Sequence, residues 1–475
     1  MQWIALYLPN LPLEALTRSL ATPEPQAVAE RQRVLACDGK ARARGVRPGM
    51  ALATACALAH DLVVRPRDPA AETEALLGLA GWAAQFTPNV APDLPDALAL
   101  EVAGSLKLFG GADRLRARLA AGGVRMGFTA HAACAPTARG AAWLARAGVE
   151  RCVESSDDLA PALAHLPLGV AVREADMRAA LHAIGVRTVS ELARLPRDGF
   201  ARRFGQALLD DLDRAHGRLA DPRAFYLPPA RFHARLELPA EATQAESLLF
   251  AAQRLFLQLE GFLAARAGGV RRLELRLGHR DAPATVVPIG LVAPSRDAAH
   301  FTRLARERLG AVALAAPVRA LTLAAADVVP LAGAPLALFD DGNGAPEDWA
   351  KLVERLRARL GAGSVHGVRV VAEHRPEYAS EPCDPARAEG SNPTDAAGPR
   401  PFWLLAAPRP LAEVDAVPHY GGPLKLLAGP ERIESGWWDG AEVARDYFVA
   451  QTPAQALVWI YRARGDGWFL HGLFA

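Results

Sequence analysis

The sequence is poor in cysteine and has none of the cysteine patterns that bind metals. Its 475 residues contain no C-x-x-C pair and no cysteine–histidine cluster at metal-ligand spacing. We therefore expect no metal site of that type. The thiols are instead predicted to be small, buried apolar side chains. The five cysteines are Cys37, Cys56, Cys134, Cys152 and Cys383.

Long apolar runs are missing as well, and none reaches the length that spans a membrane. The first 16 residues lack a basic segment and are interrupted by Pro9 and Pro12. They predict a strand and a turn, and not a signal peptide. We therefore expect a cytoplasmic protein with no membrane partner.

Net charge is low, at +2, which argues against a protein that holds nucleic acid by bulk electrostatics alone. The charge is unevenly distributed, because residues 231–330 carry about +4 and residues 340–475 about −5. A mildly basic middle is thus followed by an acidic tail.

What the sequence does contain is a succession of differently patterned segments, and its length predicts two to four domains. Residues 1–158 have an α+β pattern, with strands expected at 3–8 and 97–104 and a helix from near Leu11. From residue 159 to about 217, short amphipathic helices alternate with tight turns. Gly185 and Arg187 lie in one such helical hairpin, which is either a phosphate site or a structural turn.

Residues 232–329 predict the order β-α-β-β-α-β, a two-layer sandwich. Arginines alternate with Leu273 and Leu275 in one strand, so one face is apolar and the other basic. That basic face could lie along a phosphate backbone or be solvated surface. Its arginines are Arg271, Arg272, Arg276 and Arg280.

The C-terminal part changes character twice. Residues 373–400 have the composition of a flexible linker. The last 44 residues hold too many aromatic side chains for a solvated tail, which predicts a β-rich module or a segment that docks on a partner. The aromatic residues expected to dock are Trp437, Trp438, Trp459, Trp468 and Phe469.

The order of these segments resembles the Y-family translesion DNA polymerases, which consist of palm, fingers, thumb and little finger. Residues 36–66 (ACDGKARARGVRPGMALATACALAHDLVVRP) are similar to the fingers motif of that family, and residues 94–111 to its palm hairpin. The resemblance covers residues 1–330. It implies palm and fingers at 1–158 (fingers about 20–75), a helix-hairpin-helix thumb at 159–225 and a little finger at 231–330.

Polymerases of that family hold two Mg²⁺ ions with palm carboxylates. In this sequence the resemblance places Tyr7 and Pro9 at the positions of two acids of the first strand. In the palm hairpin Asp96 matches the Asp, but Ala97 stands where the Glu belongs. A single remaining carboxylate implies a catalytically inactive palm with no metal cofactor. The alternative is an altered Mg²⁺ site, formed from Asp93, Asp96, Glu101 or Glu14.

Nucleotide contacts are also incomplete by this resemblance. Arg42 matches a triphosphate-binding arginine and Arg146 stands where a lysine is usual, but Gly39 replaces a tyrosine. The two arginines either hold phosphate or are solvated or structural.

Four C-terminal segments (400–411, 421–440, 444–450 and 459–475) resemble the ImuB family of bacterial Y-family-like proteins. That resemblance implies a polymerase-shaped protein without the active-site acids. It also implies three protein partners: the sliding clamp (β subunit), the RecA-like protein ImuA and an error-prone DnaE-type polymerase.

Clamp binding in such proteins uses a short apolar peptide after the little finger. Residues 332–341 lie in that place, with Leu336, Leu338 and Phe339 able to fill an apolar pocket. Pro335 replaces the usual Gln, which removes a hydrogen-bonding anchor. The clamp peptide is expected within 331–345, followed by a helix and linker (346–400) and a partner-docking module (401–475).

These patterns together predict a non-catalytic polymerase-like scaffold in SOS-induced translesion synthesis. It would bind primer–template DNA through phosphates, independently of sequence, and bridge DNA, the clamp and the DnaE-type polymerase. The alternative function is an active translesion polymerase with rearranged metal ligands. A cytoplasmic protein that joins the nucleoid on DNA damage is expected in either case.

Overall fold

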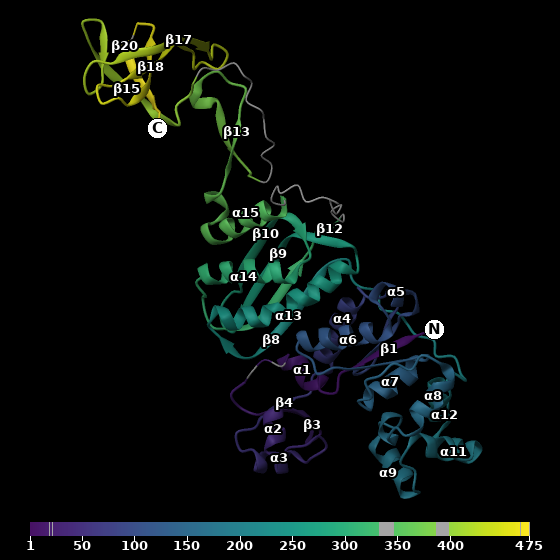
Figure 1. The fold of residues 1–475 in the computed structure, drawn as a ribbon. Coiled ribbons are helices and arrows are strands. Elements are labelled where there is room, and N and C mark those ends of the chain that lie inside the picture. The colour runs from purple at the N-terminus through teal and green to yellow at the C-terminus, as the bar shows by residue number, and fades with distance from the viewer. Residues whose placement is uncertain (19, 21, 332–345, 386–398, 466, 475) are drawn as a thin grey trace. The chain divides into compact units, whose positions relative to one another are not determined.

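The computed structural model describes residues 1–18, 20, 22–331, 346–385, 399–465 and 467–474. The chain forms two compact units, Met1–Arg359 and Leu360–Ala475 (Figure 1). Each unit is described by itself.

A four-stranded antiparallel sheet in the order β5-β6-β1-β7 forms the centre of the palm. Residues alternate between its two faces, so that Ile4 and Leu6 lie in one core and Trp3 and Ala5 in another. The expected strands at 3–8 and 97–104 are confirmed. The strands are β1 (Trp3–Tyr7), β5 (Val90–Asp93), β6 (Ala97–Glu101) and β7 (His131–Ala135).

Helices cover both faces of this sheet. The first core packs against α4 (Pro69–Ala83) and α6 (Ala112–Arg125), and the second against α7 (Ala138–Arg146). Helix α1 (Leu11–Thr17) follows β1 and begins at the residue where a helix was expected. Helix α4 starts at an N-cap, because Asp68 accepts the backbone N–H groups of Ala70 and Ala71.

The fingers form a small separate layer around a three-stranded sheet in the order β3-β2-β4. Small side chains such as Ala27, Ala41 and Ala55 fill its core. The elements are β2 (Gln26–Glu30), β3 (Arg33–Cys37), α2 (Gly39–Ala43), α3 (Leu52–Leu58) and β4 (Val63–Pro66).

The thumb consists of short helices, as the sequence predicts. Thr188 and Glu191 form a capping box that starts the second helix of the hairpin, and Gly185 supplies the turn at φ +88°. The helices are α8 (Ser156–Ala164), α9 (Ala175–Ala183), α10 (Val189–Ala193), α11 (Arg197–Phe204) and α12 (Gln206–Ala215).

The little finger confirms the β-α-β-β-α-β order. Its antiparallel sheet runs β10-β9-β11-β8, with both helices on one face and the short β12 (Val328–Pro330) paired to β9. The elements are β8 (Phe232–Ala242), α13 (Ala245–Ala264), β9 (Gly268–His279), β10 (Thr285–Ser295), α14 (Ala298–Ala311) and β11 (Val318–Ala325).

Helix α15 (Pro346–Leu360) contacts the little finger through a buried histidine–glutamate pair. His300 Nε2 lies 2.5 Å from Glu354 Oε2, and the other oxygen of Glu354 accepts the Val292 N–H at 2.6 Å. The opposite face of the helix exposes Trp349 and Leu352. The helix expected after residue 346 is therefore confirmed. Its apolar outer face was not predicted from the sequence.

The second unit contains a six-stranded antiparallel sheet in the order β16-β15-β20-β19-β18-β17, which confirms the expected β-rich module. A second, two-stranded sheet pairs β13 with β14. The strands are β13 (Gly367–Val370), β14 (Ser380–Cys383), β15 (Trp403–Val414), β16 (Val417–His419), β17 (Lys425–Ser435), β18 (Val443–Gln451), β19 (Leu457–Ala463) and β20 (Gly467–Leu473).

Two of the aromatic residues expected to dock on a partner belong to the core of this module. Trp459 and Trp468 are 2% and 6% exposed, and Phe469 is half-buried against Tyr461. The expectation that Trp459 and Trp468 dock is wrong, because the strands that flank them in the sheet cover their rings. Trp437 and Trp438, at 73% and 59% exposed, remain on the surface.

The expected linker at 373–400 is partly structured. Arg375 is buried and donates to Asp439 at 2.6 Å and to Glu373 at 2.8 Å. These bonds tie the segment to the loop after β17 within the same unit. Residues 386–398 lie outside the described part of the chain.

The cysteines follow the prediction only in part. Cys37 and Cys134 are buried, but Cys56 is exposed on α3, whose outer face is solvated. Among the described residues, no helix combines the length and apolarity that crossing a membrane requires.

Candidate functional site in the palm

The end of β1 meets the turn between β5 and β6, and this is where the resemblance places the metal ligands. Tyr7 pairs with Ala97 across the two strands. Ala97 is fully buried and offers no oxygen from its side chain. Burial and the charge of Asp96 raise the pKa of the Tyr7 phenol, so it is neutral at pH 7.

Asp93, at the end of β5, is held by two arginines from distant parts of the chain. Its Oδ2 lies 3.0 Å from Arg146 of α7, and its Oδ1 lies 2.7 Å from Arg223, which follows the thumb. Arg139 of α7 is 3.9 Å away. Burial alone would raise the pKa of Asp93, but Arg146 and Arg223 outweigh it and lower the pKa. Asp93 is therefore ionised and fully engaged with cations of the chain.

Asp96, the one carboxylate that matches the family pattern, contacts arginines too. Arg173 from the thumb donates to its Oδ2, and Arg146 lies 3.7 Å from its Oδ1. That Oδ1 is buried and accepts no hydrogen bond from the described residues. Burial raises the pKa of Asp96, although Arg173 and Arg146 oppose the rise. We call Asp93, Asp96 and these four arginines the palm cluster.

The two glutamates of the alternative metal site lie elsewhere. Glu14 of α1 is buried and accepts the N–H of Thr129 at 2.8 Å and its hydroxyl at 2.6 Å. Glu101 pairs with Trp3 at the opposite end of β6 from Ala97. Four residues of strand separate positions 97 and 101, or about 13 Å. The described residues contain no group of three or more acidic, histidine or cysteine side chains arranged to hold a metal.

These side chains do not fit the two Mg²⁺ ions of an active palm. Two hard divalent ions require several carboxylate oxygens, and the palm cluster offers one unengaged oxygen, Asp96 Oδ1. The guanidinium groups of Arg146 and Arg173 already lie against the acids and would repel a cation. Arginines thus provide the positive charge that metals provide in an active enzyme.

The structure does not bring Arg42 and Arg146 to a common site. Arg42, in the fingers, donates to Asn10 at 2.5 Å and lines a cavity of about 340 Å³ between α1 and the fingers. Arg146 belongs to the palm cluster instead. Gly39, where the family has a tyrosine, lines the same cavity as Arg42. Joint phosphate binding by the two arginines receives no support from this arrangement.

The thumb hairpin has its own partners for the backbone groups that were expected to bind phosphate. The N–H groups of Arg187 and Thr188 donate to the Glu191 carboxylate at 2.7 and 2.9 Å. The capping box therefore satisfies these donors within the chain, as in a structural turn.

The outer face of the little-finger sheet is less basic than its arginines suggest. Leu273 and Leu275 are buried and Arg272 is exposed, so the expected alternation holds. Glu274, however, lies on the same face and pairs with Arg276. Arg280 pairs with Glu241 at 3.0 Å.

Arg271 and Arg272 remain as the exposed arginines of this set without an ion pair among the described residues. The clamp-peptide residues Leu336, Leu338 and Phe339 lie outside the described part of the chain.

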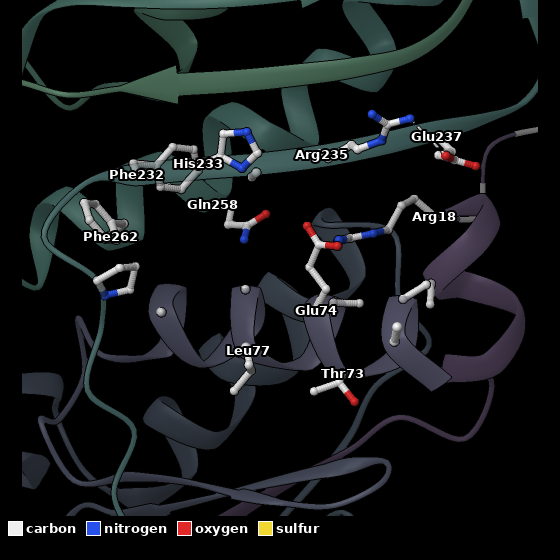
Figure 2. Close-up of a pocket in the computed structure, with 18 of the residues that line it drawn as sticks. Arg18, Thr73, Glu74, Leu77, Phe232, His233, Arg235, Glu237, Gln258 and Phe262 are labelled. Carbon is white, nitrogen blue, oxygen red and sulfur yellow. Dashed lines mark hydrogen bonds and ion pairs between the residues drawn. The ribbon is translucent and has the colours of Figure 1, made fainter. Parts of the chain in front are cut away.

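The sequence reading missed a larger cavity, of about 690 Å³, between the palm helices α1 and α4 and the little-finger elements β8 and α13 (Figure 2). Arg18, at the end of α1, and Gln258 of α13 point into it and are 7% and 8% exposed. No motif marks these two residues. The available signal was weak, because other polar residues, Glu14 and Thr17 on α1 and Arg254 on α13, are buried on the same helices.

Comparison with known proteins agrees with this architecture. The model of the impB/mucB/samB family matches residues 12–147. Protein ImuB of Caulobacter vibrioides, from strains NA1000 / CB15N and ATCC 19089 / CIP 103742 / CB 15, is 32% identical, covering 90% of this chain and all of the relative.

Two solved structures are similar at low identity. DinB from Sulfolobus solfataricus is 15% identical, with a TM-score of 0.38 over 70% of this chain and all of that one. A Dbh ternary complex is 14% identical, with a TM-score of 0.37 over the same shares.

The succession of palm, fingers, helical thumb and little finger defines a protein built like the Y-family polymerases. Within that class, identity over nearly the whole length of both chains makes the assignment specific. The chain belongs to the ImuB family.

Proposed function

We propose that this protein is a non-catalytic polymerase-like scaffold in SOS-induced translesion synthesis. The palm cluster is the observation that carries the proposal. Tyr7 and Ala97, which pair across two strands, stand where the resemblance places metal ligands, and the neighbouring acids Asp93 and Asp96 are held by arginines of the chain. A palm without metal ions cannot activate a primer hydroxyl or neutralise a triphosphate.

Primer extension by the purified full-length protein tests this proposal against its rival, an active polymerase with rearranged ligands. We expect no incorporation with either Mg²⁺ or Mn²⁺. Asp96→Ala is the matched control and should leave the background unchanged. Incorporation by the natural chain that Asp96→Ala abolishes would establish the rival instead.

DNA binding is proposed to use the exposed arginines of the little finger. A protein that neutralises phosphates releases counterions from the DNA. A plot of the logarithm of the binding constant against the logarithm of the salt concentration therefore has a slope of about −0.9 for each phosphate contact. Replacing both Arg271 and Arg272 by Gln should therefore reduce the salt slope by about 2. The matched control is the pair Arg276→Gln and Arg280→Gln, whose side chains are already engaged with glutamates. Equal effects of the two pairs would contradict the assignment.

The partners proposed for the scaffold are the sliding clamp, ImuA and an error-prone DnaE-type polymerase. Exposed apolar surface favours protein contacts, and the second unit exposes Trp437 and Trp438 at a ring-centroid distance of 4.6 Å. Replacing both by Ala should abolish capture of the DnaE-type polymerase without unfolding the module.

Clamp binding is proposed for the peptide at 332–341. Leu338→Ala combined with Phe339→Ala should abolish co-elution with the clamp. Retained co-elution would mean that the clamp motif lies elsewhere. The protein is proposed to act in the cytoplasm, on the nucleoid after DNA damage.

A further inference from the structure

The cavity of about 690 Å³ between the palm and the little finger contains a buried charge without a partner. The Arg18 side chain is 7% exposed and its guanidinium lies 4.5 Å above the ring of Phe128. Among the described residues it makes neither a hydrogen bond nor an ion pair. Burial, with a smaller contribution from Arg254, lowers the pKa of Arg18 to about 10. The group is therefore still charged at pH 7, and an uncompensated buried cation is costly.

A second buried polar group faces the same space. Gln258 of α13 is 8% exposed, lines the cavity and has no hydrogen-bond partner among the described residues. Gly78 of α4 makes room for it, because a Cβ at position 78 would lie 2.2 Å from the Gln258 amide nitrogen. Buried polar side chains normally find partners within the protein. Two such groups directed into one cavity indicate a ligand.

Acidic residues also line the cavity, but two of the three are engaged. Asp68 caps helix α4, and Glu237 pairs with Arg235 at 3.1 Å. Glu74 is exposed and attracts Arg18 without forming an ion pair with it. The charged side chains that line the cavity thus balance, three arginines against three acids, and Arg18 is the buried cation among them that forms no ion pair with the described residues.

The other end of the cavity is aromatic. In the view of Figure 2, Phe232 and Phe262 lie at one end, Arg18 and Glu74 at the other, and Gln258 between them. The two phenyl rings contact each other edge to face at 5.2 Å. Tyr226 also lines the cavity, with its ring against Gly81. A ligand that matches this distribution has an anionic group, a hydrogen-bonding middle and a planar, weakly polar body.

We propose that this cavity binds a nucleoside phosphate, with the phosphate on Arg18, polar contacts to Gln258 and the base against the aromatic end. Its volume lies within the range of small-molecule sites. Arginine is well suited to phosphate, and the half-buried Tyr226 ring offers a base more surface than Phe232 and Phe262, which are 4% and 3% exposed. The site is separate from the palm cluster and from the cavity at Arg42. It does not depend on whether the palm is catalytic.

Titration of the full-length protein with dAMP, followed calorimetrically, tests the proposal. Arg18→Gln should weaken binding at least about tenfold, since hydrogen bonds to charged groups are among the strong ones. Gln keeps a polar group over Phe128. The matched control is Arg296→Gln, an exposed arginine outside the cavity, which should change nothing. Equal binding by the Arg18→Gln variant and the natural chain would overturn the proposal.

Two further variants avoid removing a buried residue. Glu74→Gln removes the acid that attracts Arg18, at an exposed position, and should tighten binding by about threefold. Gly78→Ala should displace the Gln258 amide and weaken binding, while alanine favours the helix itself. Unchanged affinity in both variants would contradict the proposed geometry.

The source of the nucleotide is distinguished by the probe. A free nucleotide predicts saturable binding of dAMP, whereas a nucleotide unit of DNA predicts that a single-stranded oligonucleotide binds through Arg18 and dAMP does not. Inorganic phosphate is the third probe. If inorganic phosphate binds as tightly as dAMP and the oligonucleotide, the aromatic end contributes nothing to binding. The ligand would then not be a nucleoside phosphate.

Discussion

The arginines of the palm cluster and the single buried Arg18 differ in whether the chain supplies their counter-charges. In the palm cluster, Arg146 and Arg223 lie within 3.0 Å of Asp93. In the cavity beside the little finger, Arg18 has no such acid. Arginines that pair with the acids of the palm cluster disfavour the binding of a metal ion there. An arginine without an acid partner at a cavity leaves room for the anion proposed above.

The largest expected effect comes from removing the shared acid of the palm cluster. Asp93→Ala leaves Arg146 and Arg223 buried without their carboxylate, which should cost about 3–5 kcal/mol of stability. Chemical denaturation measures the loss. The matched control is Asp61→Ala, which breaks a pair with Arg44 on the exposed surface and should cost much less, because solvent screens that pair. Similar losses of stability in the two variants would show that the arginines of the palm cluster do not depend on Asp93 for their counter-charge.

Arg18 should respond in the opposite direction. Arg18→Met removes a buried charge without stranding a partner, so stability should stay constant or rise, by up to about 2 kcal/mol. Thermal unfolding in the absence of ligand measures the change. A loss of more than about 2 kcal/mol would mean that Arg18 is satisfied within the chain, and the contrast between the two regions would disappear.

The smallest effect concerns the thumb arginine of the palm cluster and depends on pH. Arg173→Gln takes a counter-charge from Asp96, and because Arg173 is partly exposed the cost at pH 7 should be about 1 kcal/mol.

Burial raises the pKa of Asp96, so in the folded protein this group takes up a proton at a higher pH than in the unfolded chain. The loss of Arg173 should therefore cost less in acid, where Asp96 takes up a proton, than at neutral pH. Denaturation curves at pH 4 and pH 7 measure the difference. An equal cost at both values would show that Arg173 acts independently of the Asp96 charge.

Much of the fold was predictable because its signals are local. The alternation of apolar residues predicted β1 and β6, and the longer pattern at 232–329 predicted the elements of the little finger except the short β12. The family resemblance also predicts that Tyr7 and Ala97 replace metal-binding acids, and that assignment stays a prediction. These predictions required only spacing along the chain.

Predictions that depended on distant partners succeeded less often. Trp437 and Trp459 look alike in sequence, but neighbouring strands bury Trp459 and leave Trp437 exposed. Arg42 and Arg146 were treated as a pair, yet Asn10 holds one and Asp93 the other. The linker at 373–400 was read from composition, which does not reveal the Arg375–Asp439 pair.

The sequence by itself determined the order of the segments and which residues stand where the resemblance places the palm acids, because periodicity and residue identity are properties of the chain. Only the tertiary structure decided which charges are compensated. Asp93 meets Arg223 across 130 residues, and Arg18 meets Gln258 across a cavity that neither segment forms alone. Electrostatic compensation depends on distance and burial, and folding sets both.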